Sequence, residues 1–389
     1  MNSFSFSSLP RIFFGAGETE KLPALIKNFG RHILLVTGAG SFIKSEKAAS
    51  LLRKFSEEGI SHRSVRIAGE PSPEDIDKNV RLLKTEKFNC VVGIGGGSVL
   101  DAGKALSAMA GREDSVIEFL EGAGTKEHPG TKIPYIAVPT TSGTGSEATK
   151  NAVLSKVGPE GFKRSLRHEN FVPDIALVDP ELTVSCPPSI TAASGMDCFT
   201  QLLEAYLSVK SNPFTDALAL EGLRAVRTSL TRVVNNGSDI EARSGMSLAA
   251  LISGICLANA GLGVVHGFAS SIGGRYVISH GIICGSLMAA SNEITVRKLR
   301  KSERGDAVLK KYALLGKTFL CVENKNEQYL IDGFLEYLRN LTDELHLPSL
   351  RETGVIGSDL KAIAESTDCK NNPVKIDPGE LLEILEMRF

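Results

Sequence analysis

Short apolar runs alternate with helical patterns in the first half of the chain. The runs are rich in aliphatic residues and predict strands over residues 32–37, 64–67, 90–94, 134–138 and 175–178. Helical patterns lie between them, one ending near Phe55 and another covering residues 73–85. Strands that alternate with helices at this spacing are typical of a parallel sheet covered by helices on both faces.

The pattern changes after Asp179 and Pro180. Strand-like runs become scarce, and apolar residues recur every three to four positions, which predicts helices. These stretches cover residues 192–209, 213–233, 240–257, 307–320 and 328–345. We therefore predict an α/β domain with a parallel sheet over residues 1–180 and an all-helical domain over residues 181–389. A length of 389 residues also favours two domains over one core.

One apolar segment needs a membrane test. Residues 245–274 contain no charged residue and are long enough to span a bilayer. The segment also contains seven glycines and polar residues such as Ser247, Asn259 and His266, and no second span or basic flanking cluster accompanies it. We predict a helix buried on all sides inside the helical domain, and no membrane partner.

Composition and charge exclude several classes of protein. Hydrophobic residues make up 42% and charged residues 23% of the chain, and the formal net charge is −1, so nucleic acid is not an expected partner. Seven cysteines without a paired spacing argue against a disulfide framework and indicate reduced thiols in a cytoplasm. No basic segment precedes an apolar run at the start, so a signal peptide is not expected.

Two polar loops follow strands where a parallel sheet binds ligands. Residues 95–98 read Gly-Gly-Gly-Ser and precede a helical pattern, and residues 139–147 read Pro-Thr-Thr-Ser-Gly-Thr-Gly-Ser-Glu. Glycines before a helix allow a phosphate to approach its free amide groups. A tight turn and a solvated loop are the ordinary alternatives. The common dinucleotide fingerprint is incomplete, because Gly38 and Gly40 are followed by Ile43 where a third glycine belongs.

A set of metal-binding side chains lies in the second half. Asp197 and Gln201 are four residues apart and share a face of the predicted helix, and His266 and His280 are surrounded by small and apolar residues. Asp and His donors suit a divalent transition metal. A single histidine on an apolar helix is more often a core residue than a ligand, so the residues alone leave both interpretations open.

Taken together, these segments resemble the iron-containing (group III) alcohol dehydrogenases, which share the dehydroquinate synthase-like fold. The resemblance runs nearly end to end, and its motifs are specific. It rests on residues 12–17, 95–105, 139–147, 173–180, 195–206 and 266–281. It implies a metal-dependent, NAD(P)-linked oxidoreductase of the CH–OH group, class EC 1.1.1.

The resemblance also implies which residues bind the nucleotide. The pyrophosphate and nearby ribose would be held by Gly96, Gly97, Ser98 and Asp101. The adenine and nicotinamide sides would be lined by Thr140, Thr141 and Thr144, with Asn151 and Lys163 also close to the cofactor. Gly38 stands where NAD-preferring members tend to carry an acidic residue, so the cofactor is NAD or NADP.

Three of the four family metal ligands are implied to be Asp197, His266 and His280. The fourth ligand, normally histidine, is Gln201 here, which either ligates weakly through its carbonyl oxygen, contacts a ligand or only replaces the histidine structurally. Ser270 stands where the family often has another histidine. One divalent metal is expected, Fe²⁺ with Zn²⁺ as the alternative. Thr141, the ribose hydroxyls and water would then carry the proton.

The sequence therefore predicts an alcohol dehydrogenase or aldehyde reductase that transfers a hydride between a small metal-bound alcohol or aldehyde and nicotinamide. One alternative is a reductase of acidic aldehydes or oxo acids, for which Arg275 would matter. Another is a nucleotide-binding homologue that has lost catalysis, motivated by Gln201 and Ser270. Homodimers or larger homo-oligomers are expected, as in the family, through the apolar segment of residues 4–14.

Overall fold

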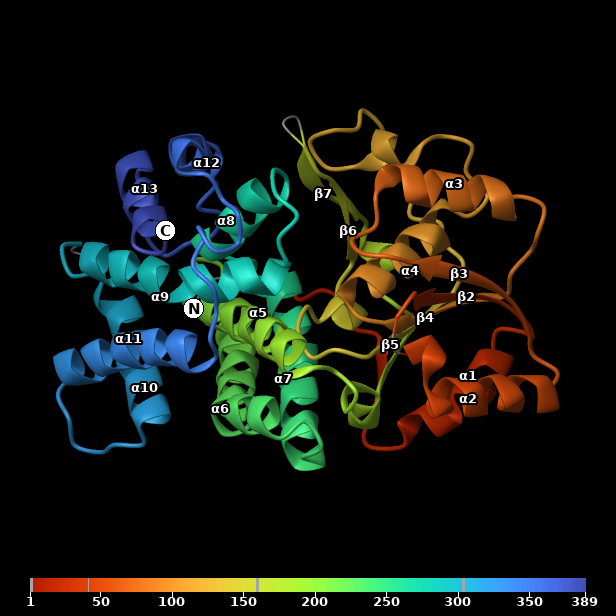
Figure 1. Ribbon diagram of the computed structural model, residues 1–389, viewed down its shortest axis with the longest axis horizontal. Coiled ribbons are helices and arrows are strands. Elements are labelled where there is room, and N and C mark those ends of the chain that lie inside the picture. The colour runs from red at the N-terminus through yellow and green to blue at the C-terminus, as the bar shows by residue number, and fades with distance from the viewer. Residues whose placement is uncertain (1–2, 41, 159–160, 303–304) are drawn as a thin grey trace.

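Six parallel strands form a sheet in the first half of the chain (Figure 1). The computed structural model describes residues 3–40, 42–158, 161–302 and 305–389. The strand order is β1-β8-β5-β4-β2-β3. The strands are β1 (Arg11–Phe14), β2 (His32–Gly38), β3 (Ser61–Ile67), β4 (Cys90–Gly95), β5 (Tyr135–Pro139) and β8 (Ile175–Val178). The five predicted strands are confirmed, each within a few residues of its predicted limits.

Helices cover both faces of this sheet because its central strands are apolar on both sides. Leu34 and Val36 of β2 pack in one core with α3 (Pro73–Leu83) and α4 (Gly97–Met109). The alternate residues of β2 point to the opposite face, since side chains alternate along a strand. That face packs against the short helix α1 (Leu22–Lys27) and the longer α2 (Glu46–Glu57). Figure 1 shows the two pairs of helices on opposite sides of the sheet.

A two-stranded antiparallel hairpin, which the sequence did not predict, follows β5. Its strands are β6 (Asn151–Lys156) and β7 (Phe162–Arg167), and they form a separate sheet. Ala152 and Leu154 of β6 and Leu166 of β7 join the core of α3 and α4. Polar residues occupy most of the remaining positions, which hid these strands from a search for apolar runs.

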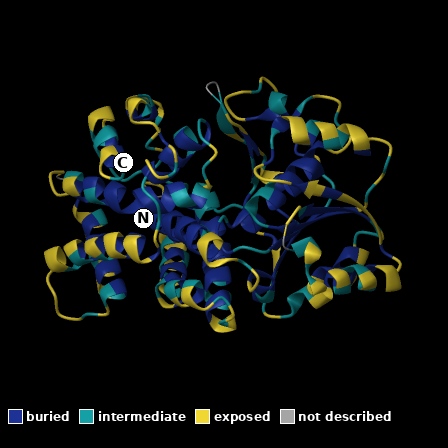
Figure 2. Ribbon diagram, viewed as in Figure 1, coloured by how far each residue is buried: buried dark blue, intermediate teal, exposed yellow. Residues whose placement is uncertain are grey.

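Helices make up the second half, as predicted. They are α5 (Pro188–Leu207), α6 (Pro213–Asn235), α7 (Ile240–Ala260), α8 (Val264–Gly273), α9 (His280–Leu299), α10 (Asp306–Leu320), α11 (Glu327–Glu344), α12 (Leu360–Ser366) and α13 (Pro378–Glu386). Helix α5 packs against α6, α7 and α9, and Figure 2 shows it buried at the centre of these helices. The division of the chain into two domains at residue 180 stays a prediction.

The uncharged segment of residues 245–274 forms two helices instead of the single predicted one. Helix α7 ends at Ala260, where Gly261 adopts φ +70, and α8 begins at Val264. Glycine permits this left-handed conformation without a steric penalty, so the chain turns there. Among the described residues, α7 is the one helix that is long and apolar enough to cross a membrane, and most of the apolar window is buried inside the protein. Helix α7 packs against α5 and α6, as expected for a helix in the core of the helical half.

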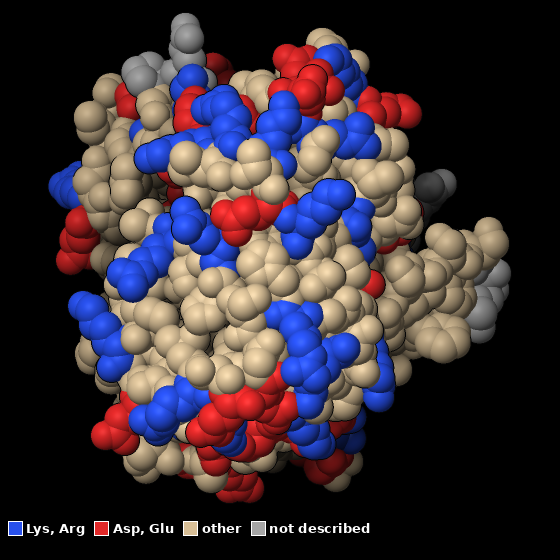
Figure 3. Space-filling view, turned by 90° about the vertical axis from the view of Figure 1, so that its right-hand side faces the viewer, with Lys and Arg blue, Asp and Glu red and all other residues tan. Residues whose placement is uncertain are grey.

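Charged side chains of both signs share the surface of the α/β half. On the face seen in Figure 3, lysine and arginine residues are interspersed with aspartate and glutamate residues instead of forming one basic field. This mixture accords with the formal net charge of −1. A broad basic surface is the usual electrostatic footprint of nucleic-acid binding, and this face does not carry one.

Candidate functional site

A cleft of about 1880 Å³ lies between the carboxyl ends of the sheet strands and the helices α5, α8 and α9. Parallel α/β sheets bind their ligands at this edge. On the sheet side the lining includes Gly38, the glycine loop at residues 96–98 and the hairpin β6–β7, and on the helical side it includes Asp197 and His266. Both groups of predicted site residues therefore face the same cavity.

The glycine loop connects β4 directly to α4. Gly96 is the residue before the helix and makes no side-chain cap, so the first amide groups of α4 are not satisfied by a cap. A Cβ atom on Gly97 would lie 2.6 Å from Cγ2 of Thr144, and one on Gly95 would lie 2.6 Å from Val99. Glycine is thus required for close packing of this loop against its neighbours. The helix end offers amide groups to an anion.

The threonine-rich loop at residues 139–147 is held in place by a buried lysine. Nζ of Lys104 on α4 donates hydrogen bonds to the backbone oxygens of Ser146 (2.9 Å) and Asn151 (2.8 Å) and to Oγ1 of Thr149 (3.1 Å). Burial lowers the pKa of Lys104 to about 8, against the opposing attraction of Asp101 and Glu147. Lys104 was not predicted, and its signal in the sequence is a lysine flanked by small and apolar residues of α4.

Most of the predicted nucleotide residues line the cleft. They are Gly38, Gly96, Gly97, Ser98, Asp101, Thr141, Thr144, Asn151 and Lys163. Thr140 is not among the lining residues, and its backbone amide donates to the oxygen of Gly95.

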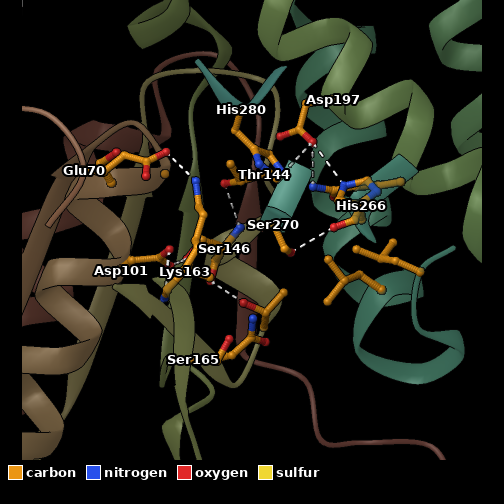
Figure 4. A pocket seen from close by; sticks show the side chains of 18 of the residues that line it. Glu70, Asp101, Thr144, Ser146, Lys163, Ser165, Asp197, His266, Ser270 and His280 are labelled. Atoms are coloured by element: carbon orange, nitrogen blue, oxygen red, sulfur yellow. Dashed lines mark hydrogen bonds and ion pairs between the residues drawn. The ribbon is translucent and has the colours of Figure 1, made fainter. Parts of the chain in front are cut away.

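Two of these side chains already have protein partners. The Asp101 carboxylate accepts hydrogen bonds from Oγ of Ser146 (2.5 Å) and the amide of Val153 (3.2 Å), so part of its capacity serves to join α4 to the threonine-rich loop and β6. Lys163 forms an ion pair with Glu70, which also lines the cleft (Figure 4). Glu70 was missed, because it lies in a loop that no motif marks.

The predicted metal ligands meet at the helical side of the cleft. Asp197 comes from α5, His266 from α8 and His280 from the first position of α9. Oδ1 of Asp197 lies 3.4 Å from Nε2 of His266 and 3.6 Å from Nε2 of His280 (Figure 4). Within the described ranges, these three side chains and Cys284 form a group whose ligand atoms lie within 4.8 Å of one another.

Glu204 orients His266. Its carboxylate accepts hydrogen bonds from the amides of Gly263 (2.8 Å) and Val265 (2.7 Å) at the start of α8, and it lies 2.7 Å from Nδ1 of His266. A carboxylate at Nδ1 fixes the ring so that Nε2 faces Asp197, the arrangement typical of metal-binding histidines. Glu204 lies seven residues after Asp197 on α5, and that two-turn helical spacing was the signal in the sequence that could have identified it.

Burial and the neighbouring side chains set the ionisation of each member of this group. Burial alone would raise the pKa of Asp197, but His280 and His266 lower it below its ordinary value, so the carboxylate is ionised. Burial lowers the pKa of His280 to about 3, so its ring is neutral at neutral pH. Burial opposes a charge on His266, but Cys284, Asp197 and Glu204 together raise its pKa well above the ordinary value.

Gln201 and Ser270 lie beside the group. Nε2 of Gln201 donates to Oδ1 of Asp197 (3.3 Å), and Oγ of Ser253 donates to Oε1 of Gln201 (2.9 Å). Oγ of Ser270 donates to the backbone oxygen of His266 (2.9 Å) on the same helix. A buried carboxylate and two imidazoles with converging atoms are the donor set of a divalent transition metal, and the residues present therefore fit one.

Two models of known protein families match the chain. The sequence model "Iron-containing alcohol dehydrogenase" matches residues 10–180, and "Fe-containing alcohol dehydrogenase family, C-terminal" matches residues 191–389. The chain belongs to the iron-containing alcohol dehydrogenase family. This confirms the resemblance found in the sequence, and the protein is an oxidoreductase of the alcohol dehydrogenase class.

Several relatives support the assignment to this iron-containing alcohol dehydrogenase family. Long-chain-alcohol dehydrogenase 1 of Geobacillus thermodenitrificans is 38% identical over 282 residues, 70% of each chain. NADPH-dependent butanol dehydrogenase of Clostridium saccharobutylicum is 29% identical over 391 residues, 97% of this chain and 96% of the relative. The crystal structure of an archaeal halo-thermophilic alcohol dehydrogenase from a Red Sea brine pool superimposes with a TM-score of 0.90 at 26% identity, covering 100% of this chain and 99% of that one.

Members of the family act on alcohols and aldehydes and use NAD(P) with a divalent metal. The converging group at Asp197 is a potential site for that metal in this chain.

Proposed function

We propose that this protein is a metal-dependent NAD(P)-linked alcohol dehydrogenase or aldehyde reductase for a small substrate. The observation that carries the proposal is the shared cleft, in which the glycine loop before α4 and the converging side chains of Asp197, His266 and His280 line one cavity. A dinucleotide bound at the loop would extend towards a substrate held at these side chains. Its nicotinamide would thus be close to a carbinol or carbonyl carbon.

Each side of the cleft contributes a separate function. The amides at the start of α4 would bind the pyrophosphate, and the hydroxyls of Thr141 and Thr144 would line the nicotinamide side. Asp197, His266 and His280 would hold Fe²⁺ or Zn²⁺, which supplies Lewis-acid polarisation of the substrate oxygen when bound. Enclosure between the two halves would limit water at the point of hydride transfer.

We propose Thr141 as part of the proton path. The Thr141 side chain lines the cleft beside Gly96, and Ser270 replaces the histidine that the family often has. A hydroxyl both donates and accepts, so Thr141 can pass a proton between the substrate oxygen and water. A Thr141→Val enzyme should show an altered pH profile of kcat, measured over the range in which wild type is stable. An unchanged profile would exclude Thr141 from the path.

The direct test is turnover by the purified protein. The metal content is measured first, and the oxidation of NADH and NADPH is then followed with a panel of neutral aldehydes. We expect about one divalent metal per chain, turnover, and loss of turnover after chelation that Fe²⁺ or Zn²⁺ restores. A protein that binds nucleotide, retains no metal and reduces nothing would instead be a homologue that has lost catalysis.

A second candidate is the reduction of acidic aldehydes or oxo acids. Arg275 and Lys370 both line the cleft, and Nζ of Lys370 lies 3.5 Å from Oγ of Ser270, one turn of α8 from His266. A cation beside Ser270 in this cleft would bind a carboxylate or sulfonate on the substrate. Replacing Lys370 or Arg275 with alanine would then raise KM for the anionic aldehyde and leave the KM for neutral aldehydes unchanged.

We also propose that the chain forms homodimers or larger homo-oligomers through its N-terminal segment. The exposed side chains there include Phe4, Leu9, Ile12 and Phe14, and β1 is an edge strand of the sheet. An exposed apolar edge strand is a common pairing surface. Sedimentation of wild type and of a Phe14→Lys variant tests this, with a smaller species expected for the variant.

A further inference from the structure

We propose that the thiolate of Cys284 is the fourth protein ligand of this metal site, in the place that the family resemblance gives to Gln201. The proposal rests on the metal site described under the proposed function and identifies one more of its residues. It changes the protein donor set from one carboxylate, one amide and two imidazoles to one carboxylate, one thiolate and two imidazoles.

Helix geometry brings Cys284 to the site. It lies on α9 four residues after His280, so the two side chains share one face of the helix, and side chains lean towards the helix N-terminus. Sγ of Cys284 lies 3.9 Å from Nε2 of His266. Tetrahedral ligands at ordinary zinc bond lengths are about 3.3–3.6 Å apart. The separations of 3.4 and 3.6 Å at Asp197 and of 3.9 Å between Cys284 and His266 are close to these values before any metal contracts the group.

The amide of Gln201 is occupied by other contacts. Its nitrogen faces Asp197, and its oxygen accepts a hydrogen bond from Ser253 on the far side. To become a ligand, the amide would have to turn over and present its oxygen beside the Asp197 carboxylate. A neutral amide oxygen is also a weaker donor for a transition metal than a thiolate. Gln201 therefore positions Asp197, and Cys284 supplies the missing strong donor.

The position of Cys284 leaves the cleft side of the site open. Its side chain is fully buried and is not part of the cleft lining, whereas Asp197, His266 and His280 are. The thiolate would approach the metal from the protein interior, opposite the side at which a substrate oxygen enters. A substrate oxygen would then enter as a fifth ligand, and zinc in catalytic sites can expand to five-coordinate.

Charge balance also favours this set. With Asp197 and a Cys284 thiolate, the protein supplies two negative charges against one divalent cation. The S–H proton leaves to solvent when the S–metal bond forms, because a metal ligand binds as the thiolate. Thiolate and imidazole ligands favour Zn²⁺ over Fe²⁺. We therefore expect Zn²⁺ to bind more tightly than Fe²⁺.

Packing is the alternative role of Cys284. It lies in an apolar cluster with Ile283 and Leu287, and buried cysteines often act as small apolar residues. Under this alternative, serine in its place would leave the metal spectrum and affinity of the site unchanged.

Cobalt substitution distinguishes the two roles without measuring activity. Wild type, Cys284→Ser, Gln201→Ala and the control Cys256→Ser are loaded with Co²⁺, and the thiolate-to-cobalt charge-transfer band is recorded in the near ultraviolet. Cys256 is a matched control because it is fully buried on α7 outside the metal group. We expect the band in wild type, Gln201→Ala and Cys256→Ser, and its loss in Cys284→Ser. Chelator competition should show Zn²⁺ affinity at least about tenfold lower in Cys284→Ser.

A band that survives in Cys284→Ser, or no band in cobalt-loaded wild type, would overturn the proposal. If Cys284→Ser does not fold, X-ray absorption of the zinc-loaded wild type decides, since one Zn–S distance of about 2.3 Å requires a thiolate ligand. NAD(P)H turnover is scored separately. A sulfur ligand without turnover would count against the proposed function alone, and turnover with only oxygen and nitrogen ligands would count against Cys284 alone.

Discussion

The two sides of the cleft would bind their proposed ligands by different means. The nucleotide side is formed by backbone atoms, with Gly96 and Gly97 leading into α4 and a loop held by Lys104. The metal side is formed by side chains that three helices bring together, from Asp197 to His280. A backbone site depends on the absence of side chains, whereas a side-chain site depends on their identity. The first therefore tolerates little change in size, and the second admits exchanged donors if the atoms still converge.

Removing the central metal-binding side chain should have the largest effect. In Asp197→Ala, the group loses its only carboxylate, and we expect kcat to fall on the order of 10³-fold because the developing alkoxide loses its stabilising charge. Metal analysis should show a content well below that of wild type, with nucleotide binding retained. The neighbouring Cys198→Ala is the control, since Cys198 is buried in the helical core instead. Full activity of Asp197→Ala would show that this group of side chains does not take part in the reaction.

Loss of the orienting carboxylate should have the next largest effect. Glu204→Gln keeps the size of the side chain but weakens its hold on Nδ1 of His266 and on the amides that begin α8. We expect metal affinity to fall about 10–100-fold, as for other partners of metal-binding histidines. Chelator competition measures it. An unchanged affinity would mean that His266 is oriented by packing alone.

On the nucleotide side, an added side chain should weaken nucleotide binding through its size, without any change in charge. In Gly97→Ala, the added methyl group would meet Thr144 at 2.6 Å and separate the two loops. We expect the Kd for NAD(P)H to rise about tenfold or more, corresponding to an overpacking cost of roughly 1–3 kcal/mol, with metal content unchanged. Gly40→Ala is the control, because a Cβ there meets nothing within 4 Å. Equal effects from both variants would contradict the close-packing argument.

A charge can nevertheless be added to the nucleotide side where space allows. A Cβ on Gly38 would lie 3.7 Å from its nearest neighbour, an ordinary contact, and the residue lines the cleft. We expect Gly38→Asp to lower kcat/KM for NADPH relative to NADH by roughly tenfold, since two like charges about 4 Å apart repel by about 1 kcal/mol in water and by more near a protein surface. Gly38→Ala should leave the ratio unchanged. If Gly38→Ala changes the ratio as much as Gly38→Asp does, the size of the side chain and not its charge determines the cofactor preference.

The effect with the least consequence for turnover is a pH dependence of stability in the loop beside the cleft. Burial raises the pKa of Glu147 to about 7, so the folded chain keeps a proton that the unfolded chain loses near its ordinary pKa. Stability from this group is therefore present at acidic pH and is lost as the pH rises towards 7. The slope is at most about 1.4 kcal/mol per pH unit. Denaturant unfolding of wild type and Glu147→Gln between pH 5 and 7 should show a flatter dependence in the variant.

The sequence identified the elements whose signals are local. Apolar runs in the first half predicted the strands of the parallel sheet, because strands buried on both faces must be apolar throughout. The β6–β7 hairpin was missed because its exposed positions are polar. The division of residues 245–274 into two helices was missed because Gly261 breaks a pattern that is otherwise uniformly apolar. Both elements were missed because their formation depends on tertiary contacts that a local apolar pattern does not show.

For the site, the sequence by itself determined the donor types and the glycine loop, and through the family resemblance it singled out Asp197, His266 and His280. The tertiary structure decided which atoms converge. It brought Cys284 within reach of His266, placed Glu204 behind that ring and turned the Gln201 amide towards Asp197 and Ser253. The physical reason is that a ligand set is defined by distances of a few ångströms between helices far apart in sequence. Spacing along the sequence identifies only pairs on one helix, such as His280 and Cys284. The packing of the helices decides which residues of different helices come into contact.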